Sequence, residues 1–202
     1  MAVVNPRIAP FINVTFWVTS VWWELPRNHR GLDIATATAG GSVPIYSMCN
    51  GTVIRSEVSG SLTEKVGYGN VVIVEDDVTH MGFLFAHLDR RDVSVGDHVV
   101  IGQQIGMEGE TGEAYGMHLH LEMQDLTNHP WQYHAPKEVY TNPAEWMGIP
   151  NVEGTECYYN GIPIPPPTPV VISKKNKFKW VLYSRKFRNR RQFNWHKILI
   201  NL

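Results

Sequence analysis

The sequence predicts a mainly β fold, built on an antiparallel sheet with few short helices. Two observations predict it: short runs of strand-forming residues are separated by glycine-containing turns, and only one short segment of the expected core carries the signals that begin a helix. With 202 residues, of which 43% are hydrophobic and 18% charged, the chain is long enough for one substantial core. No internal repeat or long heptad pattern indicates another architecture.

Four runs have strand character, at 51–58, 70–75, 82–88 and 118–124. In the last run polar and apolar residues alternate strictly, and a β-strand directs such alternating residues to opposite faces. We therefore expect one polar face, bordering a groove, and one apolar face. The polar set is His118, His120 and Glu122, and the apolar set is Leu119, Leu121 and Met123.

The predicted helix begins near Asn142 and continues to about Trp146. Asparagine can cap the amino-terminal end of a helix with its side chain, and Pro143 suits the first turn because its fixed φ angle is helical. This segment follows the last predicted strand of the core.

Two histidine motifs far apart in the sequence together indicate a zinc site: His29 to Asp33, and His118 with His120. Gly31 lies inside the first motif, and its flexibility would let a loop fold His29 and Asp33 toward the same ion. Three protein ligands and an open position are typical of catalytic zinc, whereas structural zinc usually has four protein ligands.

Cysteine usage argues against a structural zinc finger. Cys49 and Cys157 are the two cysteines of the chain, they lie far apart, and neither belongs to a Cys-x-x-Cys pair. The sequence also has no His-Glu-x-x-His motif, so the helix-borne glutamate base of other zinc peptidases is absent.

With these motifs in this order, the chain resembles the lysostaphin/LytM-type zinc metallopeptidases, family 23 of the metallopeptidases, from about residue 18 to about residue 146. The order of several shorter motifs between the two histidine motifs is also similar to that family. These shorter motifs lie at 42–46, 50–54, 67–73, 85–88, 95–97, 102–106 and 109–112.

The resemblance implies a LytM-like, duplicated-hybrid-motif fold in which His29, Asp33 and His120 bind one zinc ion. It implies that His118 and His87 assist catalysis without binding the metal. Zinc polarises a carbonyl and lowers the pKa of bound water, and a nearby histidine can take up a proton near neutral pH. Which histidine is the general base stays open. The implied activity is hydrolysis of peptide bonds in the stem or cross-bridge of bacterial peptidoglycan.

Two positions depart from the family pattern. Met117 replaces the proline that usually precedes the first histidine of the pair, and 22–28 replaces a glycine-rich turn. We expect these differences to affect groove shape and substrate selection. For Glu122 two interpretations remain open: it orients a metal ligand from behind, or it is a surface carboxylate on the same strand face.

Composition predicts three segments: a peptidase domain at 1–150, a proline-rich linker at 151–172 and a basic, aromatic tail at 173–202. Residues 1–169 hold 8 Lys/Arg against 19 Asp/Glu, a formal charge of −11, whereas 170–202 hold 10 Lys/Arg and no acid, a charge of +10. The tail is therefore expected to be a separate functional unit.

The composition of the tail suits polyanions such as anionic wall polymers, a membrane surface or a virion or other protein partner. The alternative is a solvated segment or a strand or helix docked on the acidic core. Nucleic acid is a weaker candidate because no recognised nucleic-acid module accompanies the charge.

The sequence shows no convincing signal peptide and no run long enough to span a membrane. A hydrolase that acts on the cell wall outside the cytoplasm then needs another route, and the chain looks similar to tail-tip or lysis enzymes of tailed phages. Two other functions stay open: a wall-binding or structural component of a phage tail or other assembly without turnover, and a metallopeptidase that acts on a protein.

Overall fold

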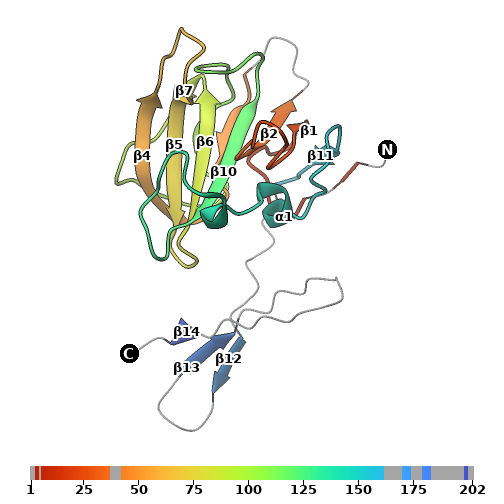
Figure 1. The fold of residues 1–202 in the computed structure, drawn as a ribbon. Coiled ribbons are helices and arrows are strands. Elements are labelled where there is room, and N and C mark those ends of the chain that lie inside the picture. Colours follow the sequence, from red (N-terminus) through yellow and green to blue (C-terminus); the bar gives the residue numbers. More distant parts are fainter. Residues whose placement is uncertain are drawn as a thin grey trace. The chain divides into compact units, whose positions relative to one another are not determined.

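An eight-stranded antiparallel sheet with the order β11-β1-β2-β10-β6-β5-β4-β8 is the main element of the fold. Figure 1 shows β4, β5, β6 and β10 side by side at its centre. In chain order the strands are β1 (Thr15–Ser20), β2 (Leu32–Thr36), β4 (Gly51–Ser59), β5 (Gly69–Asp76), β6 (Met81–Leu88), β8 (His98–Val99), β10 (Leu119–Asp125) and β11 (Glu156–Tyr158).

This computed structural model describes residues 3–4, 6–36 and 42–161, and the backbone of three further strands. The chain divides into two compact units, Met1–Pro163 and Ile164–Leu202. The second unit contains a three-stranded antiparallel sheet of β12 (Val170–Ser173), β13 (Lys179–Leu182) and β14 (Ile198–Leu199). The proline-rich stretch 162–169 and most of the predicted tail lie outside the described residues.

A smaller antiparallel sheet with the order β3-β9-β7 completes the first unit. Its strands are β3 (Pro44–Tyr46), β9 (Gln104–Met107) and β7 (Arg90–Arg91). Ile45 and Ile105 from this sheet are fully buried in the same core cluster as residues of the large sheet. The mainly β prediction is confirmed, and the four predicted strands correspond to β4, β5, β6 and β10.

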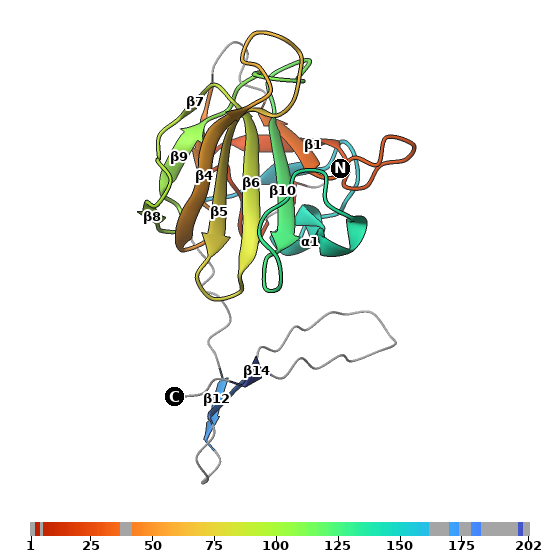
Figure 2. The same ribbon diagram turned by 60° about the vertical axis from the view of Figure 1, so that its left-hand side comes forward.

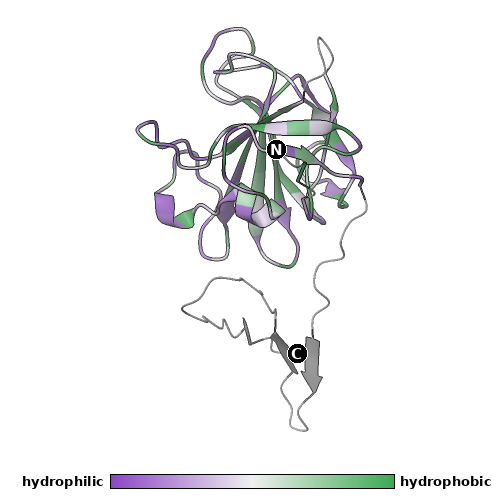
Figure 3. Ribbon diagram, turned by 90° about the vertical axis from the view of Figure 1, so that its right-hand side faces the viewer, coloured by the Kyte–Doolittle hydropathy of each residue, from purple (hydrophilic) through white to green (hydrophobic). Residues whose placement is uncertain are grey.

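The two faces of the large sheet have different neighbours. The main core lies on one face and includes Leu121 of β10, Phe85 of β6 and Ile34 of β2. On the other face, a smaller cluster around Ala86 and Trp131 covers part of β5 and β6. Figure 3 shows the apolar residues concentrated in the strands and hydrophilic ones along the loops.

The predicted helix is present as α1 (Pro143–Met147), preceded by the 3-10 turn η1 (Lys137–Val139). The Asn142 side chain accepts a hydrogen bond from the Ala144 backbone N–H, as expected of an amino-terminal cap, and Gly148 ends the helix in a left-handed conformation. No helix among the described residues is long and apolar enough to cross a membrane.

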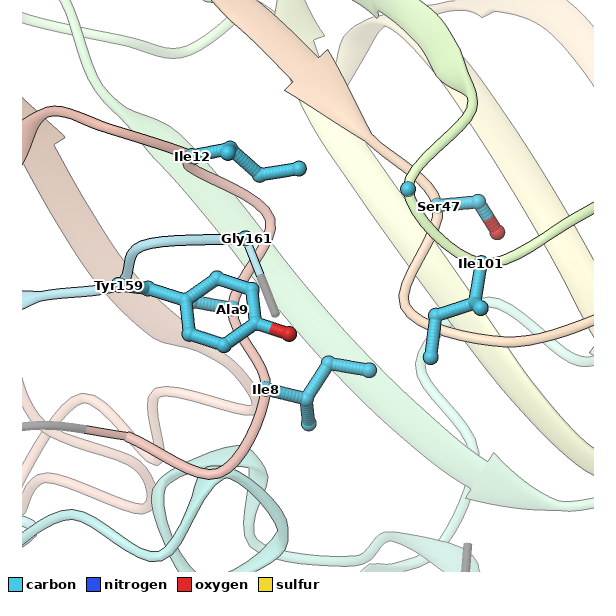
Figure 4. A pocket seen from close by; sticks show the side chains of 8 residues that line it. Ile8, Ala9, Ile12, Ser47, Ile101, Tyr159 and Gly161 are labelled. Carbon is cyan, nitrogen blue, oxygen red and sulfur yellow. The ribbon is translucent and has the colours of Figure 1, made fainter. Parts of the chain in front are cut away.

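Strand β1 and the amino-terminal segment before it pack against the rest of the first unit. In Figure 2, β1 crosses behind β4 to β10, and it pairs with β2 on one side and β11 on the other. Figure 4 shows the side chains that line a small cavity, where the segment of Ile8 and Ile12 approaches Tyr159 and Ile101. Its volume is about 10 Å³. The lining of this cavity is almost entirely apolar, so it offers no groups for chemistry.

Candidate metal centre

The register between two adjacent strands brings two predicted ligands together. Asp33 of β2 is the Cα partner of His120 of β10, so the two side chains project from the same face of the sheet. The loop before β2 adds His29. His29 Nε2 lies 3.1 Å from Asp33 Oδ1 and 3.1 Å from His120 Nδ1, and His120 Nδ1 lies 2.8 Å from Asp33 Oδ1. These three residues form a group that could hold a metal ion.

The protonation of the two imidazoles tests whether a cation fits this group. His29 Nδ1 lies 2.9 Å from the Val21 carbonyl oxygen, which can only accept a hydrogen bond, so Nδ1 carries the proton and Nε2 presents a lone pair. His120 Nε2 lies 3.1 Å from Glu122 Oε1 and donates to it in the same way, which leaves a lone pair on Nδ1. Two lone pairs and an Asp33 oxygen thus face one another, an arrangement that a cation stabilises.

The donor types and spacing suit zinc. Histidine nitrogen and carboxylate oxygen bind Zn²⁺ at about 2.0–2.2 Å, so neighbouring ligands of a tetrahedral site lie about 3.3 Å apart. The three separations of 2.8 to 3.1 Å approach that value. With three protein donors the set leaves a fourth position, as in catalytic zinc sites.

The electrostatics of the metal-free group also favour a positive charge there. Burial lowers the pKa of His120, but hydrogen bonds to Asp33 and Glu122 outweigh it and raise the pKa to about 10. Burial raises the pKa of Asp33, but the neighbouring His120 and His29 imidazoles hold that pKa well below its ordinary value. Asp33 is therefore ionised, and without a metal a proton on His120 Nδ1 takes the place of the cation.

Gly31 is needed for space and not for flexibility, so that part of the sequence interpretation is wrong. Its φ angle is outside the left-handed region, and Asp33 belongs to β2 rather than to a loop. A Cβ atom on Gly31 would lie 2.6 Å from Nε2 of His120 and 2.7 Å from the backbone oxygen of Leu121. The bare backbone therefore lets the His120 ring lie close to the loop of the first motif.

His87 reaches the site through a β-bulge. Residues 70 and 72 of β5 pair with Leu88 and Phe85 of β6, so β6 carries one extra residue between them, and His87 has φ 61°. Regular alternation would place His87 beside Phe85 in the main core. The bulge instead turns it to the site face, where its ring centroid lies 4.9 Å from that of His118 and 5.7 Å from that of His120.

His87 and His118 both present Nε2 as a proton acceptor. The Nδ1–H of His87 donates to the Thr111 carbonyl at 2.8 Å, and the Nδ1–H of His118 donates to the Gly116 carbonyl at 2.8 Å. Nε2 of His118 lies 3.8 Å from Asp33 Oδ1. Burial, followed by the nearby His120 and His118, lowers the pKa of His87 to about 3, so this imidazole is neutral at physiological pH.

Tyr68 also belongs to the site, although the sequence analysis gave it no role there. Its hydroxyl donates to Glu122 Oε1 at 2.8 Å, and its ring lies 5.6 Å from the ring of His120. Glu122 itself is fully buried, so the open interpretation of this residue as a surface carboxylate is wrong. The strand alternation indicated the face of Glu122 correctly, but a hydroxyl donor from the residue just before β5 leaves no signal in sequence spacing.

The segment that departs from the family pattern borders the metal group. The backbone N–H of Trp23 donates to the His29 carbonyl at 2.6 Å. Lys137 Nζ lies 4.7 Å from the Trp23 ring centroid and 5.7 Å from that of Trp22, both within range of cation–π attraction. Trp22, Trp23 and Lys137 therefore form an aromatic and cationic cluster, and the backbone of Trp23 bonds to that of His29.

Residues 27–133 match peptidase family M23, and this stretch contains all five predicted site residues. The chain belongs to peptidase family M23. The predicted resemblance is thereby confirmed. The first strand, β1, and the last strand of the large sheet, β11, lie outside the matched stretch, at the β2 edge of the sheet.

Two characterised relatives are similar over about half of the chain. Glycyl-glycine endopeptidase ALE-1 of Staphylococcus capitis is 35% identical over 106 residues, which cover 50% of this chain and 25% of ALE-1. Peptidoglycan DD-endopeptidase ShyA of Vibrio cholerae serotype O1 is 33% identical over 96 residues, which cover 47% of this chain and 20% of ShyA. The match therefore spans only a quarter or less of the length of these relatives.

Solved structures show the same fold at lower sequence identity. Lysostaphin from Staphylococcus simulans superposes with a TM-score of 0.53 at 19% identity, over 83% of this chain and 62% of that chain. A chain of the SpoIIQ–SpoIIIAH pore-forming complex also superposes with a TM-score of 0.53, at 21% identity, over 72% of this chain and 92% of that chain. Since the fold occurs in an antimicrobial peptidase and in a pore-forming complex, function must be argued from the site.

Proposed function

We propose that this protein is a zinc-dependent endopeptidase that hydrolyses peptide bonds in the stem or cross-bridge of bacterial peptidoglycan. The observation that carries the proposal is the convergence of His29, Asp33 and His120 on one point, with His118 and His87 alongside. Membership of family M23 supports it, as do relatives that are a glycyl-glycine endopeptidase and a peptidoglycan DD-endopeptidase.

In this proposal His29 binds zinc through Nε2, His120 through Nδ1 and Asp33 through Oδ1. When bound, zinc acts as a Lewis acid on a carbonyl oxygen and lowers the pKa of coordinated water, so that water can react near neutral pH. The residues of the chain supply the remaining functions: they fix the donor atoms, accept and return a proton, and surround the developing charge.

His118 and His87 are proposed to manage proton transfer and charge. Both are tied through Nδ1 to backbone carbonyls, so each keeps a fixed orientation with Nε2 free to accept a proton. Nε2 of His118, at 3.8 Å from Asp33 Oδ1, is close to the donor group without belonging to it. After accepting a proton, His118 can donate it to the leaving amine. Because burial lowers the pKa of His87 to about 3, His87 would hold a proton only beside a developing negative charge, where its imidazolium would stabilise an oxyanion.

The bond that we propose is cleaved is a peptide bond in either the stem or the cross-bridge of peptidoglycan. The glycyl-glycine endopeptidase and the DD-endopeptidase are 35% and 33% identical to this chain, so sequence similarity favours neither substrate. The aromatic and cationic cluster of Trp22, Trp23 and Lys137 belongs partly to the segment that bonds to the His29 backbone, and it is the proposed place for the two specificities to differ.

The proposal places the site of action outside the cytoplasm, on the cell wall, with delivery by a virion or by a lysis system as the predicted route. Charge supports a separate targeting role for residues 170–202, which carry +10 against −11 for residues 1–169. Anionic wall polymers or a protein partner on a virion would complement such a segment.

A wall-binding or structural component without turnover is the competing function. The retained donor set and the two adjacent histidines favour an enzyme, because wall binding alone needs neither a metal group nor proton acceptors beside it. Turnover is therefore the property to measure.

The test is incubation of the zinc-loaded full chain with purified glycine-bridged and directly cross-linked peptidoglycan, followed by mass spectrometry of new amino termini. His120→Ala and a chelator should abolish release, and added zinc should restore it only to the chelated wild type. His80→Ala is the matched control, since His80 is an exposed histidine that pairs with Glu75 in a turn. Zinc-loaded protein that binds both walls and releases no new termini would support the structural function instead.

A further inference from the structure

Glu122 is a buried carboxylate directly behind a proposed zinc ligand. It follows His120 by two residues on β10, so both side chains lie on the same face of the sheet, and it has no solvent exposure. Burying an unpartnered carboxylate is costly, so a buried glutamate must be compensated by hydrogen bonds or charge. The identity of its partners therefore shows what this residue does.

Both hydrogen bonds of Glu122 converge on one oxygen. Oε1 accepts from Nε2–H of His120 at 3.1 Å and from the hydroxyl of Tyr68 at 2.8 Å, whereas Oε2 has no partner among the described residues. A carboxylate placed only for stability would be expected to satisfy both oxygens. Glu122 is instead held so that one oxygen faces the outer nitrogen of His120.

Tyr68 is itself fixed in place. Its ring stacks on Tyr133 at 5.4 Å between centroids and on His134 at 5.7 Å. Burial and the charge of Glu122 raise the pKa of the Tyr68 hydroxyl, so it keeps its proton and donates throughout the physiological pH range. Tyr68, held by its stacked neighbours, therefore fixes the position of the Glu122 carboxylate, which in turn contacts the His120 imidazole.

We propose that Glu122, held by Tyr68, is a positioning residue that fixes the orientation and tautomer of His120 for zinc binding. Because the carboxylate only accepts, Nε2 of His120 must carry the proton, and the lone pair on Nδ1 then faces Asp33 and His29. Second-layer carboxylates on ligating histidines usually strengthen metal binding by 10- to 100-fold, about the effect expected here. The inference rests on the proposed role of His120 as a zinc ligand.

The next polar residue of the same strand provides a matched control. Gln124 is also fully buried on the face of Glu122, but it bonds to the backbone of Gln132 and not to the site. Gln124→Leu should therefore affect stability without affecting zinc affinity. Glu122→Leu removes the acceptor at similar size, and Glu122→Gln restores an oxygen acceptor without the charge.

The experiment measures the zinc dissociation constant of the full chain by competition with a chromophoric chelator, alongside thermal unfolding. We expect Glu122→Leu to weaken zinc binding about 10- to 100-fold, Glu122→Gln to recover most of that loss, and Tyr68→Phe to show a smaller loss. In zinc-loaded wild type, nitrogen-15 spectra of the imidazoles should show His120 protonated at Nε2. Gln124→Leu should bind zinc as wild type does.

The outcomes separate this inference from the proposed function. If wild type binds no zinc, or His120→Ala binds it equally well, the proposed metal site is wrong. If zinc binding depends on His120 but folded Glu122→Leu retains wild-type affinity, only the positioning role is overturned. Should Glu122→Leu not fold, Tyr68→Phe together with Glu122→Gln decides the matter, because unchanged affinity in both variants would overturn the role of the pair.

Discussion

The two faces of β10 differ in what their side chains do, although their residues alternate along one strand. Leu119, Leu121 and Met123 are fully buried in the main core. On the opposite face, His120 belongs to the metal group and Glu122 contacts His120 from behind. A shift of one residue in register would exchange these two faces. Packing of the apolar face therefore fixes the register that places His120 opposite Asp33.

The largest expected effect comes from the site face and leaves the core intact. His118→Ala should reduce kcat by about 10²- to 10⁴-fold, the usual contribution of a general acid or base, with little change in the free energy of unfolding. Zinc content should remain that of wild type, because His118 Nε2 lies 3.8 Å from Asp33 and outside the donor group. Activity assays, metal analysis and thermal unfolding on the same preparation check all three. A zinc-free His118→Ala protein would make His118 a ligand.

Leu121→Ala is the corresponding change on the core face. It removes a fully buried side chain from the main cluster and should lower the free energy of unfolding by about 2–5 kcal/mol. At a temperature where the variant is folded, kcat per zinc-loaded molecule should stay within a few-fold of wild type. Denaturant unfolding measures the first quantity. A loss of kcat as large as that of His118→Ala would mean that core packing and site geometry are not separable.

The sequence predicted the strand face of this site but not its bulge. Strict alternation from His118 to Met123 correctly indicated one polar and one apolar face. The position of His87 could not be derived in this way, since period-two alternation places it with Phe85 in the core. The extra residue of a bulge is a property of two paired strands, and the motif order of the family was the only sequence signal for it.

Gly31 shows a second limit of sequence reasoning. Glycine in a motif suggests flexibility, but the structure uses the missing side chain to admit the His120 ring. Such close approaches between segments 90 residues apart have no local signal. The predicted boundaries of 151–172 and 173–202 remain predictions. Residues 151–161 are described and include β11 of the large sheet, whereas 162–169 and most of 173–202 lie outside the described residues.

Gly31→Ala tests how tightly the two motifs approach. The added methyl group would contact Nε2 of His120 at 2.6 Å and the Leu121 backbone, so the variant should lose about 1–3 kcal/mol of stability and bind zinc more weakly. In a His120→Ala background the ring is absent, and the stability cost of Gly31→Ala should decrease. Thermal unfolding of the four proteins checks this. Equal costs in both backgrounds would assign the strain to the backbone contact with Leu121 alone.

The smallest effect concerns the bulge that turns His87 from the core face to the site face. His87 has φ 61°, a conformation that costs a residue with a side chain about 1–2 kcal/mol relative to glycine. His87→Gly and His87→Ala should therefore lose activity equally, but the glycine variant should be more stable than the alanine variant by about 1 kcal/mol. Chemical unfolding of the two variants measures the difference.

Ala86 provides the control for that comparison, because it precedes His87 on β6 and is not among the residues with positive φ. Ala86→Gly should destabilise the protein by about 0.5–1 kcal/mol, the opposite direction to the exchange of alanine for glycine at position 87. If this exchange lowers the free energy of unfolding at position 86 and raises it at position 87, the two measurements alone would locate the bulge at His87. If the exchange of alanine for glycine changes stability in the same direction at both positions, β6 is regular there in solution. No bulge would then explain why His87 lies on the site face.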